Sequence, residues 1–467
     1  MRDRGQASGV PDALSQNPVR KVGMVSLGCA KNLVDAEIML GSAAGAGFAV
    51  TSEAEEADIL VVNTCGFIES AKQESIEAIL TARRRPDQKL VVAGCLSQRY
   101  REELKAEMPE VDAFMSLDDV ANAGEIFNDV LSREGTGPSV LQGRSRYIPD
   151  YDTPRFRLTP RHSAYVKIAE GCNHPCSFCV IPQMRGRHRS RSISSVAGEI
   201  RSLVRDGVKE INLISQDTTY FGMDLWTSRP GPRQPVERGH GPTLADLLDE
   251  IGGIRGDFWV RLLYTHPAHW GDALIDAIAR NPHVAPYVDM PLQHIHPAML
   301  AAMRRETSRE HIEQLIVRLR AGIPNLAIRT TFIVGFPGET EEHFESLLEF
   351  ICRVRFERLG VFKYSREEGS RAAKMEDQVP ERTKNARLRK AMAEQQRIAT
   401  EIAADKNGQT LRVLADSPRS ARTAHDAPDV DCRVILSNDV QAGEFHDVLV
   451  TGSRVYDLLA VRRQPPD

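Results

Sequence analysis

The sequence predicts an α/β protein of three parts: an N-terminal doubly wound parallel-sheet domain, a central partial (β/α) barrel and a small C-terminal β-barrel. In the first two parts, apolar runs of strand length alternate with helical patterns, which is typical of parallel sheets. The last part has short β-type runs separated by turn residues, as in small barrels. A chain of 467 residues is also too long for one ordinary core.

The first domain is expected at residues 20–134, with strands at 22–27, 59–63 and 90–93. Helical spacing of apolar residues between these runs indicates a β-α-β alternation. Residues 1–19 are polar and lack the hydrophobic region of a secretory signal, so they are predicted to be a disordered leader. Residues 135–161, which contain Pro and Arg, are predicted to be a linker.

The second domain is expected at residues 162–395, and six strands are predicted in it. They lie at 164–168, 210–214, 259–263, 288–290, 328–334 and 359–362. A charged, alanine-rich helix is predicted over 384–406, and residues 396–407 are expected to connect it to the last domain. That domain, 408–462, has predicted strands at 411–414, 432–436 and 447–451.

Composition narrows the function classes. The net charge of −4 gives no overall attraction for a polyanion, and the local basic run of Arg185, Arg187, Arg189 and Arg191 does not change that balance. No apolar stretch approaches the length of a bilayer span. A cytoplasmic location is therefore expected, where thiols stay reduced. The eight cysteines then point to metal binding, catalysis or burial.

Cys172, Cys176 and Cys179 form a C-x3-C-x2-C cluster directly after a predicted strand. We call them the central triplet. Three thiolates on one loop can converge on one metal centre, and iron–sulfur clusters are normally held by cysteine thiolates. Three ligands leave one position open, which is typical of catalytic metal sites. The alternatives are a zinc site with His174 as the fourth ligand, or three buried thiols.

Cys29, Cys65 and Cys95 each follow a predicted strand of the first domain. We call them the N-terminal triplet. The carboxyl ends of parallel strands lie at one edge of a sheet, so these thiols can meet although they are distant in sequence. Gly28 and Gly94, which precede two of them, permit tight turns. The alternative is three buried structural cysteines.

At this point the sequence resembles a known family. C-x3-C-x2-C after the first barrel strand is similar to the radical S-adenosylmethionine (SAM) superfamily. With the N-terminal triplet and the C-terminal β-module, the chain resembles the methylthiotransferases over nearly its whole length. The segments "SLGCAKNLVDAEIMLG", "EINLISQDTTYFG", "MPLQH", "GVFKYSREEGS" and "RTAHDAPDVD" resemble the RimO-type branch, which modifies a ribosomal protein. They differ from the MiaB-type branch, which modifies a tRNA adenosine. The segment "YTHPAHW" departs from the family pattern, and so does Ile295-His296-Pro297 after "PLQH".

The resemblance implies an N-terminal methylthiotransferase domain, a radical SAM domain and a TRAM domain. It implies two 4Fe-4S clusters, one on each triplet, with SAM bound at the open iron of the central one. A 5′-deoxyadenosyl radical would then act on the β-carbon of an aspartate in the twelfth small-subunit ribosomal protein, and the second cluster would carry the sulfur. Gln216, Val334 and Gly335, at predicted strand ends, are candidate SAM contacts; the alternative is ordinary strand-end structure. The reductant would be a flavodoxin or ferredoxin.

The charge of the last domain favours a protein substrate over a nucleic acid. From residue 408 to residue 467 there are seven basic and nine acidic side chains, whereas a module that grips tRNA should be basic. These carboxylates could also simply solvate a surface. Three other functions remain open: a MiaB-type tRNA methylthiotransferase, a non-catalytic iron–sulfur electron carrier, and a radical enzyme whose second cluster only relays electrons.

Overall fold

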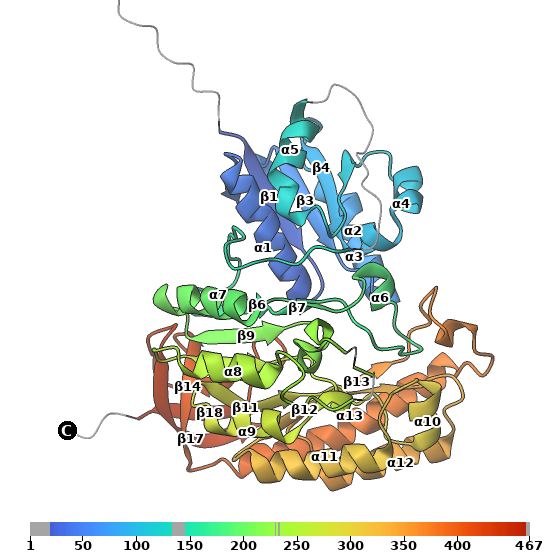
Figure 1. Ribbon diagram of the computed structural model, residues 1–467, viewed down its shortest axis with the longest axis vertical. Helices are drawn as coiled ribbons and strands as arrows, with labels where there is room; N and C mark the ends of the chain where they lie inside the picture. Colours follow the sequence, from blue (N-terminus) through green and yellow to red (C-terminus); the bar gives the residue numbers. More distant parts are fainter. Residues whose placement is uncertain (1–18, 133–144, 229, 232–233, 464–467) are drawn as a thin grey trace, which may run out of the picture.

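The computed structural model describes residues 19–132, 145–228, 230–231 and 234–463. Figure 1 shows the N-terminal domain at one end of the molecule, above the central domain, and the C-terminal barrel beside the central domain. The expected leader lies outside the described residues except for Val19, as does the first part of the expected linker, 135–144. In the described part of the chain, no helix has both the length and the hydrophobicity needed to cross a bilayer.

The N-terminal domain is a five-stranded parallel sheet of order β2-β1-β3-β4-β5. Val61 of β3 (Ile59–Thr64) packs with the side of the sheet that carries the first and last helices, and Val62 packs with the other side. The doubly wound prediction is therefore confirmed. The elements are β1 (Lys21–Ser26), α1 (Ala30–Gly45), β2 (Ala49–Thr51), η1 (Ala54–Glu56), β3, α2 (Glu69–Ala82), β4 (Lys89–Gly94), α3 (Cys95–Arg99), α4 (Arg101–Glu107), β5 (Ala113–Phe114), η2 (Val120–Asn122) and α5 (Ala123–Ser132).

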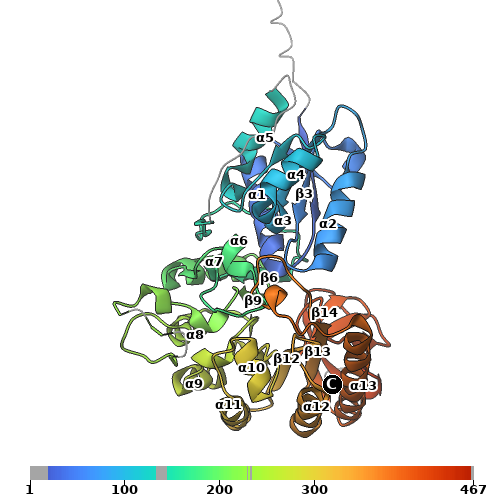
Figure 2. The ribbon, with the colours of Figure 1, turned by 90° about the vertical axis from the view of Figure 1, so that its right-hand side faces the viewer.

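The central domain is an open parallel sheet of order β13-β12-β11-β10-β9-β6, in agreement with the predicted partial barrel. Most of its helices pack on one face of the sheet around one large core (Figure 2). Its strands are β6 (Ser163–Lys167), β7 (Ala169–Glu170), β8 (Arg189–Ser190), β9 (Glu210–Ile214), β10 (Trp259–Leu262), β11 (Val284–Asp289), β12 (Ala327–Val334) and β13 (Arg358–Lys363). Its helices are α6 (Ile181–Met184), α7 (Ile193–Arg205), η3 (Thr218–Tyr220), η4 (Met223–Leu225), α8 (Leu244–Gly252), η5 (Pro267–His269), α9 (Asp272–Arg280), α10 (Pro297–Ala302), α11 (Arg309–Gly322), α12 (Glu341–Val354) and η6 (Ala372–Lys374).

The predicted alanine-rich helix is present as α13 (Glu381–Ala404). Ala391 and Ile398 are fully buried in the same core as Phe332 of β12. The helix continues to residue 404, so most of the expected connector, 396–407, belongs to it, and its end leads into the C-terminal domain.

The C-terminal domain is a closed five-stranded barrel of order β14-β15-β16-β18-β17, which confirms the small β-barrel. Its strands are β14 (Thr410–Ser417), β15 (Ser420–Thr423), β16 (Val434–Leu436), β17 (Phe445–Arg454) and β18 (Asp457–Arg462). β15 and β18 were not among the predicted strands. They are short or have mixed apolar and polar residues, so they show little period of their own.

A buried ion cluster holds this barrel against the central sheet. Glu210, the first residue of β9, is fully buried, and its carboxylate lies 2.9 Å from Arg261 Nη2 and 2.8 Å from Arg422 Nη2. Arg422 belongs to the barrel strand β15 and also pairs with Asp416 at 2.8 Å. One carboxylate therefore neutralises guanidinium groups from two domains.

Replacing Glu210 by glutamine (Glu210→Gln) is expected to destabilise the protein by about 3–5 kcal/mol, because it leaves the buried Arg261 without a carboxylate and leaves Arg422 with Asp416 alone. The measurement is the melting temperature by calorimetry. Asp257→Asn is the matched control, since Asp257 pairs with Arg412 on the surface and such pairs contribute about 0–1 kcal/mol. Equal shifts for the two variants would contradict the role given to Glu210.

The same cluster predicts a pH dependence. Burial alone would raise the pKa of Glu210, but Arg422 and Arg261 hold the pKa below its usual value. A carboxylate with a lowered pKa in the folded state stabilises the protein above its unfolded pKa, and this stability is lost as the pH falls. We expect the difference in melting temperature between the wild type and Glu210→Gln to shrink below about pH 4.3. A constant difference down to pH 2 would contradict this.

Candidate functional site

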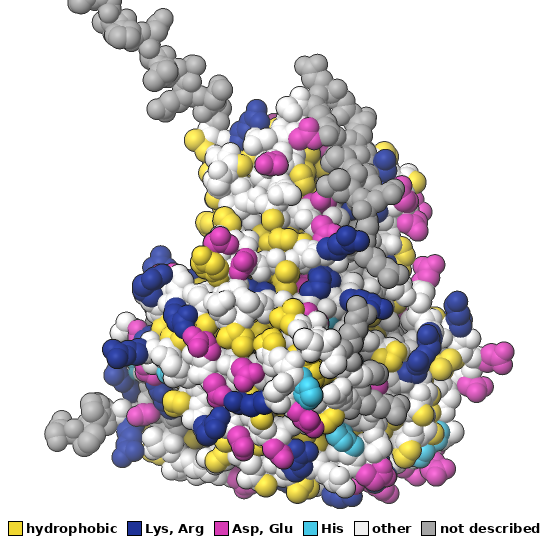
Figure 3. All heavy atoms as spheres, in the orientation of Figure 1, with side chains coloured by type: hydrophobic (Ala, Val, Ile, Leu, Met, Phe, Trp, Pro, Cys, Tyr) yellow, Lys and Arg dark blue, Asp and Glu magenta, His cyan; other side chains and the backbone are white. Residues whose placement is uncertain are grey.

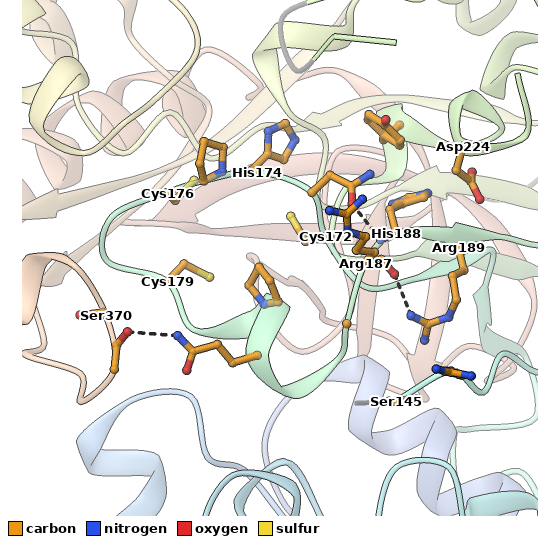
Figure 4. Close-up of a pocket in the computed structure, with 18 of the residues that line it drawn as sticks. Ser145, Cys172, His174, Cys176, Cys179, Arg187, His188, Arg189, Asp224 and Ser370 are labelled. Atoms are coloured by element: carbon orange, nitrogen blue, oxygen red, sulfur yellow. Dashed lines mark hydrogen bonds between the residues drawn. The ribbon is translucent and has the colours of Figure 1, made fainter. Parts of the chain in front are cut away.

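The central triplet lies on the loop between β7 and α6. Cys172, Cys176 and Cys179 are partly exposed free thiols that line one cavity of about 910 Å³. Figure 4 shows all three along the loop that borders this cavity. Gly171 lets the loop close, because its φ is +83° and a Cβ there would lie 2.1 Å from the carbonyl oxygen of Arg187. The predicted site residues are therefore brought together.

Burial and neighbouring thiols raise the pKa of two cysteines of this loop, Cys172 and Cys179. Burial raises the pKa of Cys179 to about 12, with a further contribution from Cys176. Burial and the two neighbouring thiols hold the pKa of Cys172 well above its usual value. Such thiols become a stable set of thiolates only beside a cation, because a coordinating metal deprotonates its thiol ligands.

The zinc alternative required His174 to turn toward these cysteines. His174 instead has one ring nitrogen 2.7 Å from Asp217 Oδ2 and the other 2.6 Å from Glu306 Oε2. Both of its nitrogens are engaged away from the sulfur atoms. The loop therefore offers three ligands to a metal centre in this arrangement.

The N-terminal triplet also comes together. Cys29 precedes α1 after β1, Cys65 follows β3, and Cys95 opens α3 after β4. These three strands are neighbours in the sheet, so their carboxyl ends meet at one edge. Gly28 and Gly94 have φ of +88° and +94°, and a Cβ on Gly28 would lie 3.2 Å from Cys65 Sγ. The tight turns that the sequence predicted at these glycines are thus present, and the turn at Gly28 brings the backbone close to Cys65.

Positive charge surrounds this triplet. Burial alone would raise the pKa of Cys29, but Lys31 and Arg185 hold the pKa below its usual value. Burial raises the pKa of Cys95 to about 11, although Arg185 opposes that shift. An anionic set of thiolates would therefore find compensating charge here.

Helix α6 connects the two triplets. It begins two residues after Cys179, and its Met184 packs against Cys95 in one small cluster. Arg185, which follows the helix directly, lies with Nη2 3.4 Å from Cys95 Sγ and 3.0 Å from Asp35 Oδ2. Figure 1 shows α6 and α3 on facing sides of the domain boundary. Both triplets thus border the same boundary.

Sequence reasoning missed Arg185 as a site residue and grouped it with a basic run. The structure buries Arg185 and Arg191, and Arg191 pairs with Glu199 at 2.5 Å. Of the four arginines in that run, Arg187 and Arg189 line the cavity. Arg305 was also missed: its Nη1 lies 3.4 Å from Cys176 Sγ. Each triplet therefore has one cysteine that accepts a hydrogen bond from an arginine.

Replacing Arg185 by glutamine is expected to lower iron occupancy of the N-terminal triplet, with about a 10–100-fold loss in metal affinity, because partners next to metal ligands have effects of that size. Iron counting and electron paramagnetic resonance (EPR) would report it, and Arg185→Lys should keep most of the occupancy. Arg305→Gln is the control, since it should affect only the central triplet. Equal effects of Arg185→Gln on both clusters would contradict the assignment.

The three candidate SAM contacts lie at strand ends, as predicted, but none lines the cavity. Gln216 donates its Nε2 hydrogen to Glu170 Oε1 at 2.5 Å. Val334 is fully buried. Gly335 has φ of +71°, and a Cβ there would lie 2.3 Å from Lys384 Cγ. The approach of Lys384 therefore explains this glycine, and SAM contact by the three remains a prediction.

Comparisons with known proteins cover almost the whole chain. The uncharacterized protein family UPF0004 matches residues 21–116, the radical SAM superfamily matches 166–351, and the TRAM domain matches 408–462. The ribosomal protein uS12 methylthiotransferase RimO of Opitutus terrae is 57% identical over 94% of this chain and 96% of its own length. Its counterpart from Akkermansia muciniphila is 52% identical over 94% of this chain and 99% of its own.

Among solved structures, the radical SAM methyltransferase TsrM from Kitasatospora setae has a similar fold. It aligns with a TM-score of 0.53 and 16% identity, covering 73% of this chain and 72% of TsrM.

Proposed function

The chain belongs to the RimO family of ribosomal protein uS12 methylthiotransferases, and from that premise we propose that it attaches a methylthio group to the β-carbon of an aspartate in uS12. The observation that carries the proposal is the pairing of two thiol triplets at one domain boundary. An electron carrier would gain nothing from two three-ligand sites, whereas sulfur insertion needs one site for radical generation and one for sulfur.

The residues present fit the two implied 4Fe-4S clusters. All eight cysteines are free thiols, and the two triplets supply three converging ligands each. The central triplet would hold the cluster that binds SAM, and the N-terminal triplet the cluster that carries sulfur. When bound, these groups supply the one-electron reduction of SAM and the sulfur to be transferred.

The protein's own contribution is placement and charge. Arg185 and Arg305 each donate a hydrogen bond to one cysteine, which stabilises the thiolate form. Lys167 is buried and pairs with Asp35 of the N-terminal domain at 2.5 Å and with Glu170 at 2.7 Å. This pairing holds β6, the edge strand of the central sheet, against helix α1 of the N-terminal domain.

Further parts of the proposal concern partners. A flavodoxin or ferredoxin would supply the electron, and the cytoplasm, where ribosomal proteins are assembled, would be the place of action. A nucleic acid is not the proposed substrate. Basic and acidic side chains are interspersed over the face shown in Figure 3, and the C-terminal domain is slightly acidic, which suits a basic ribosomal protein.

The test is anaerobic reconstitution with iron and sulfide, then incubation with SAM, a reductant and a uS12 peptide that carries the candidate aspartate. We expect the peptide to gain the mass of one methylthio group in place of one hydrogen. A peptide with that aspartate replaced by alanine is the control. Gain on tRNA alone would assign the protein to the MiaB-type activity, and no gain on either would overturn the proposal.

A further inference from the structure

Behind the loop of the central triplet lies a buried group of histidines and carboxylates that the proposed reaction does not use. Its members come from that loop, from the ends of β9 and β10, and from the segment after α10. They are His174, Asp217, His266 and His269, each at most 8% exposed, and Glu306, whose side chain is 4% exposed. Asp217 and His269 are among the most buried, at 1% and 0%. Titratable groups at this depth require partners.

His174 lies between the two carboxylates. Its Nε2 is 2.7 Å from Asp217 Oδ2, and its Nδ1 is 2.6 Å from Glu306 Oε2. Two carboxylates therefore share one imidazole. Even with that ring protonated, the three groups together retain one negative charge. Arg305 also acts electrostatically on this cluster, and a divalent cation between the carboxylates would compensate their buried negative charge more directly.

His269 faces the same carboxylate with a lone pair. Its Nδ1 lies 3.0 Å from the carbonyl oxygen of Gln234, and a carbonyl can only accept, so Nδ1 carries the hydrogen. In the neutral ring, Nε2 then has the lone pair. That atom is buried, has no hydrogen-bond partner among the described residues, and lies 3.7 Å from Asp217 Oδ2. A lone pair opposite a carboxylate is repulsive unless a cation lies between them.

We propose that His174 Nε2, His269 Nε2 and Asp217 Oδ2 form a binding site for one divalent transition-metal ion, distinct from the two iron–sulfur clusters. Two imidazoles and one carboxylate are an established ligand set for zinc and ferrous iron. Metal–ligand bonds of about 2.0–2.1 Å place tetrahedral ligands about 3.3 Å apart. The two distances from Asp217 Oδ2, 2.7 Å to His174 and 3.7 Å to His269, lie on either side of that value. One ring nitrogen from each of His174, His266 and His269 also lies within 4.8 Å of the other two.

In both histidine ligands the ring nitrogen that would not bind the metal already has a hydrogen-bond acceptor, as is usual in metal sites. Glu306 accepts from Nδ1 of His174, and the Gln234 carbonyl accepts from Nδ1 of His269. Such partners fix the tautomer and orient the ring toward the metal. A divalent ion that replaces the proton of His174 also balances the two carboxylates, and the proton is released to solvent.

His266 belongs to the same cluster but has another role. Its Nδ1 accepts the backbone N–H of Ala268 at 3.2 Å, so the hydrogen of its neutral ring is on Nε2, which cannot then bind a metal. The ring stacks on His174 with centroids 3.7 Å apart. His266 Nε2 and Glu306 Oε1 are both buried without a partner among the described residues. These two atoms suit a water molecule on the fourth metal position.

The site also has an entry path and a mechanical consequence. His174 lines the cavity beside the central triplet, so an ion can reach it from solvent. It lies two residues from both Cys172 and Cys176. A metal shared by His174, Asp217 and His269 would tie the cysteine loop to the ends of β9 and β10.

The test uses the full-length protein, isolated anaerobically, reconstituted with iron and sulfide, incubated with zinc and dialysed. We expect about one zinc per chain by mass spectrometry of metals. Zinc K-edge absorption should show nitrogen and oxygen ligands at about 2.0–2.1 Å. His269→Gln and Asp217→Asn should each lose this zinc while the iron content stays unchanged. Asp217→Asn keeps the Oδ1 oxygen that accepts the N–H of Tyr220, so the local turn should persist.

His294→Gln is the matched control, because His294 is equally buried but pairs with Glu339. It should retain the zinc. Zinc bound through sulfur at about 2.3 Å, zinc unaffected by either ligand variant, or no zinc after dialysis would each overturn the proposal. Methylthio transfer is measured separately, so a protein that binds this zinc but does not modify uS12 would contradict only the proposed function.

Discussion

Replacing Cys172, Cys176 and Cys179 together by alanine is expected to lower uS12 methylthiolation by about 10³-fold or more, to the background of the assay. Three thiols on one loop supply all the cysteine ligands of this site, and no other cysteine borders the cavity among its lining residues. Formation of 5′-deoxyadenosine from SAM should disappear as well. Iron should fall from about eight to about four atoms per chain.

The control is Cys352→Ala, which removes an exposed thiol on α12 and should change neither iron nor product. The measurements are liquid chromatography of 5′-deoxyadenosine and mass spectrometry of the peptide. Continued SAM cleavage by the triple variant would show that the radical chemistry belongs to another site.

Replacing Cys29, Cys65 and Cys95 together by alanine is expected to lower methylthio transfer by about 10³-fold, as for the central triplet. SAM cleavage should remain measurable. These thiols lie in the N-terminal domain, whereas the loop of the central triplet is part of the central domain. Iron should again fall to about four atoms per chain. Both triple variants should therefore lose methylthio transfer, but only the variant of the central triplet should lose SAM cleavage.

The ratio of 5′-deoxyadenosine to methylthiolated peptide distinguishes a sulfur-carrying role of these cysteines from a structural one. It should rise steeply in this variant, because hydrogen abstraction continues without a sulfur to transfer. A variant that still inserts sulfur would overturn the role of this triplet. Loss of both activities together with a lower melting temperature would indicate that these cysteines only hold the fold.

Much of the fold could be predicted because strands and helices differ in the period of their apolar residues. The prediction for β9 matched the structure at both ends, and β1, β3 and β4 lay within one residue of their predicted positions. β2 and β5 were not predicted, because strands of two or three residues are too short to show a period of apolar residues. Cys29, Cys65 and Cys95 could be grouped because each follows a strand, and parallel strands have their carboxyl ends at one edge of the sheet.

Other parts of the site depend on contacts that sequence spacing does not encode. Arg185 reaches Cys95 across 90 positions, and Arg305 reaches Cys176 across 129. The segment that contains His266 and His269 was noticed only as a departure from the family pattern. Its proximity to His174 arises from the adjacency of β9 and β10 in the sheet. The packing of the Lys384 side chain against Gly335 is another contact that the sequence spacing does not indicate.

The ion pairs across the domain boundary also limit how the molecule can be divided. Glu37 of α1 is fully buried and pairs with Arg155, which lies beyond the break in the described chain and also pairs with Glu199 of α7. A fragment that ended near residue 132 would keep Glu37 and Asp35 but lose every cation that neutralises them. The N-terminal domain is thus not a self-sufficient module, and an insertion or deletion in the connecting segment must still allow Arg155 to pair with Glu37.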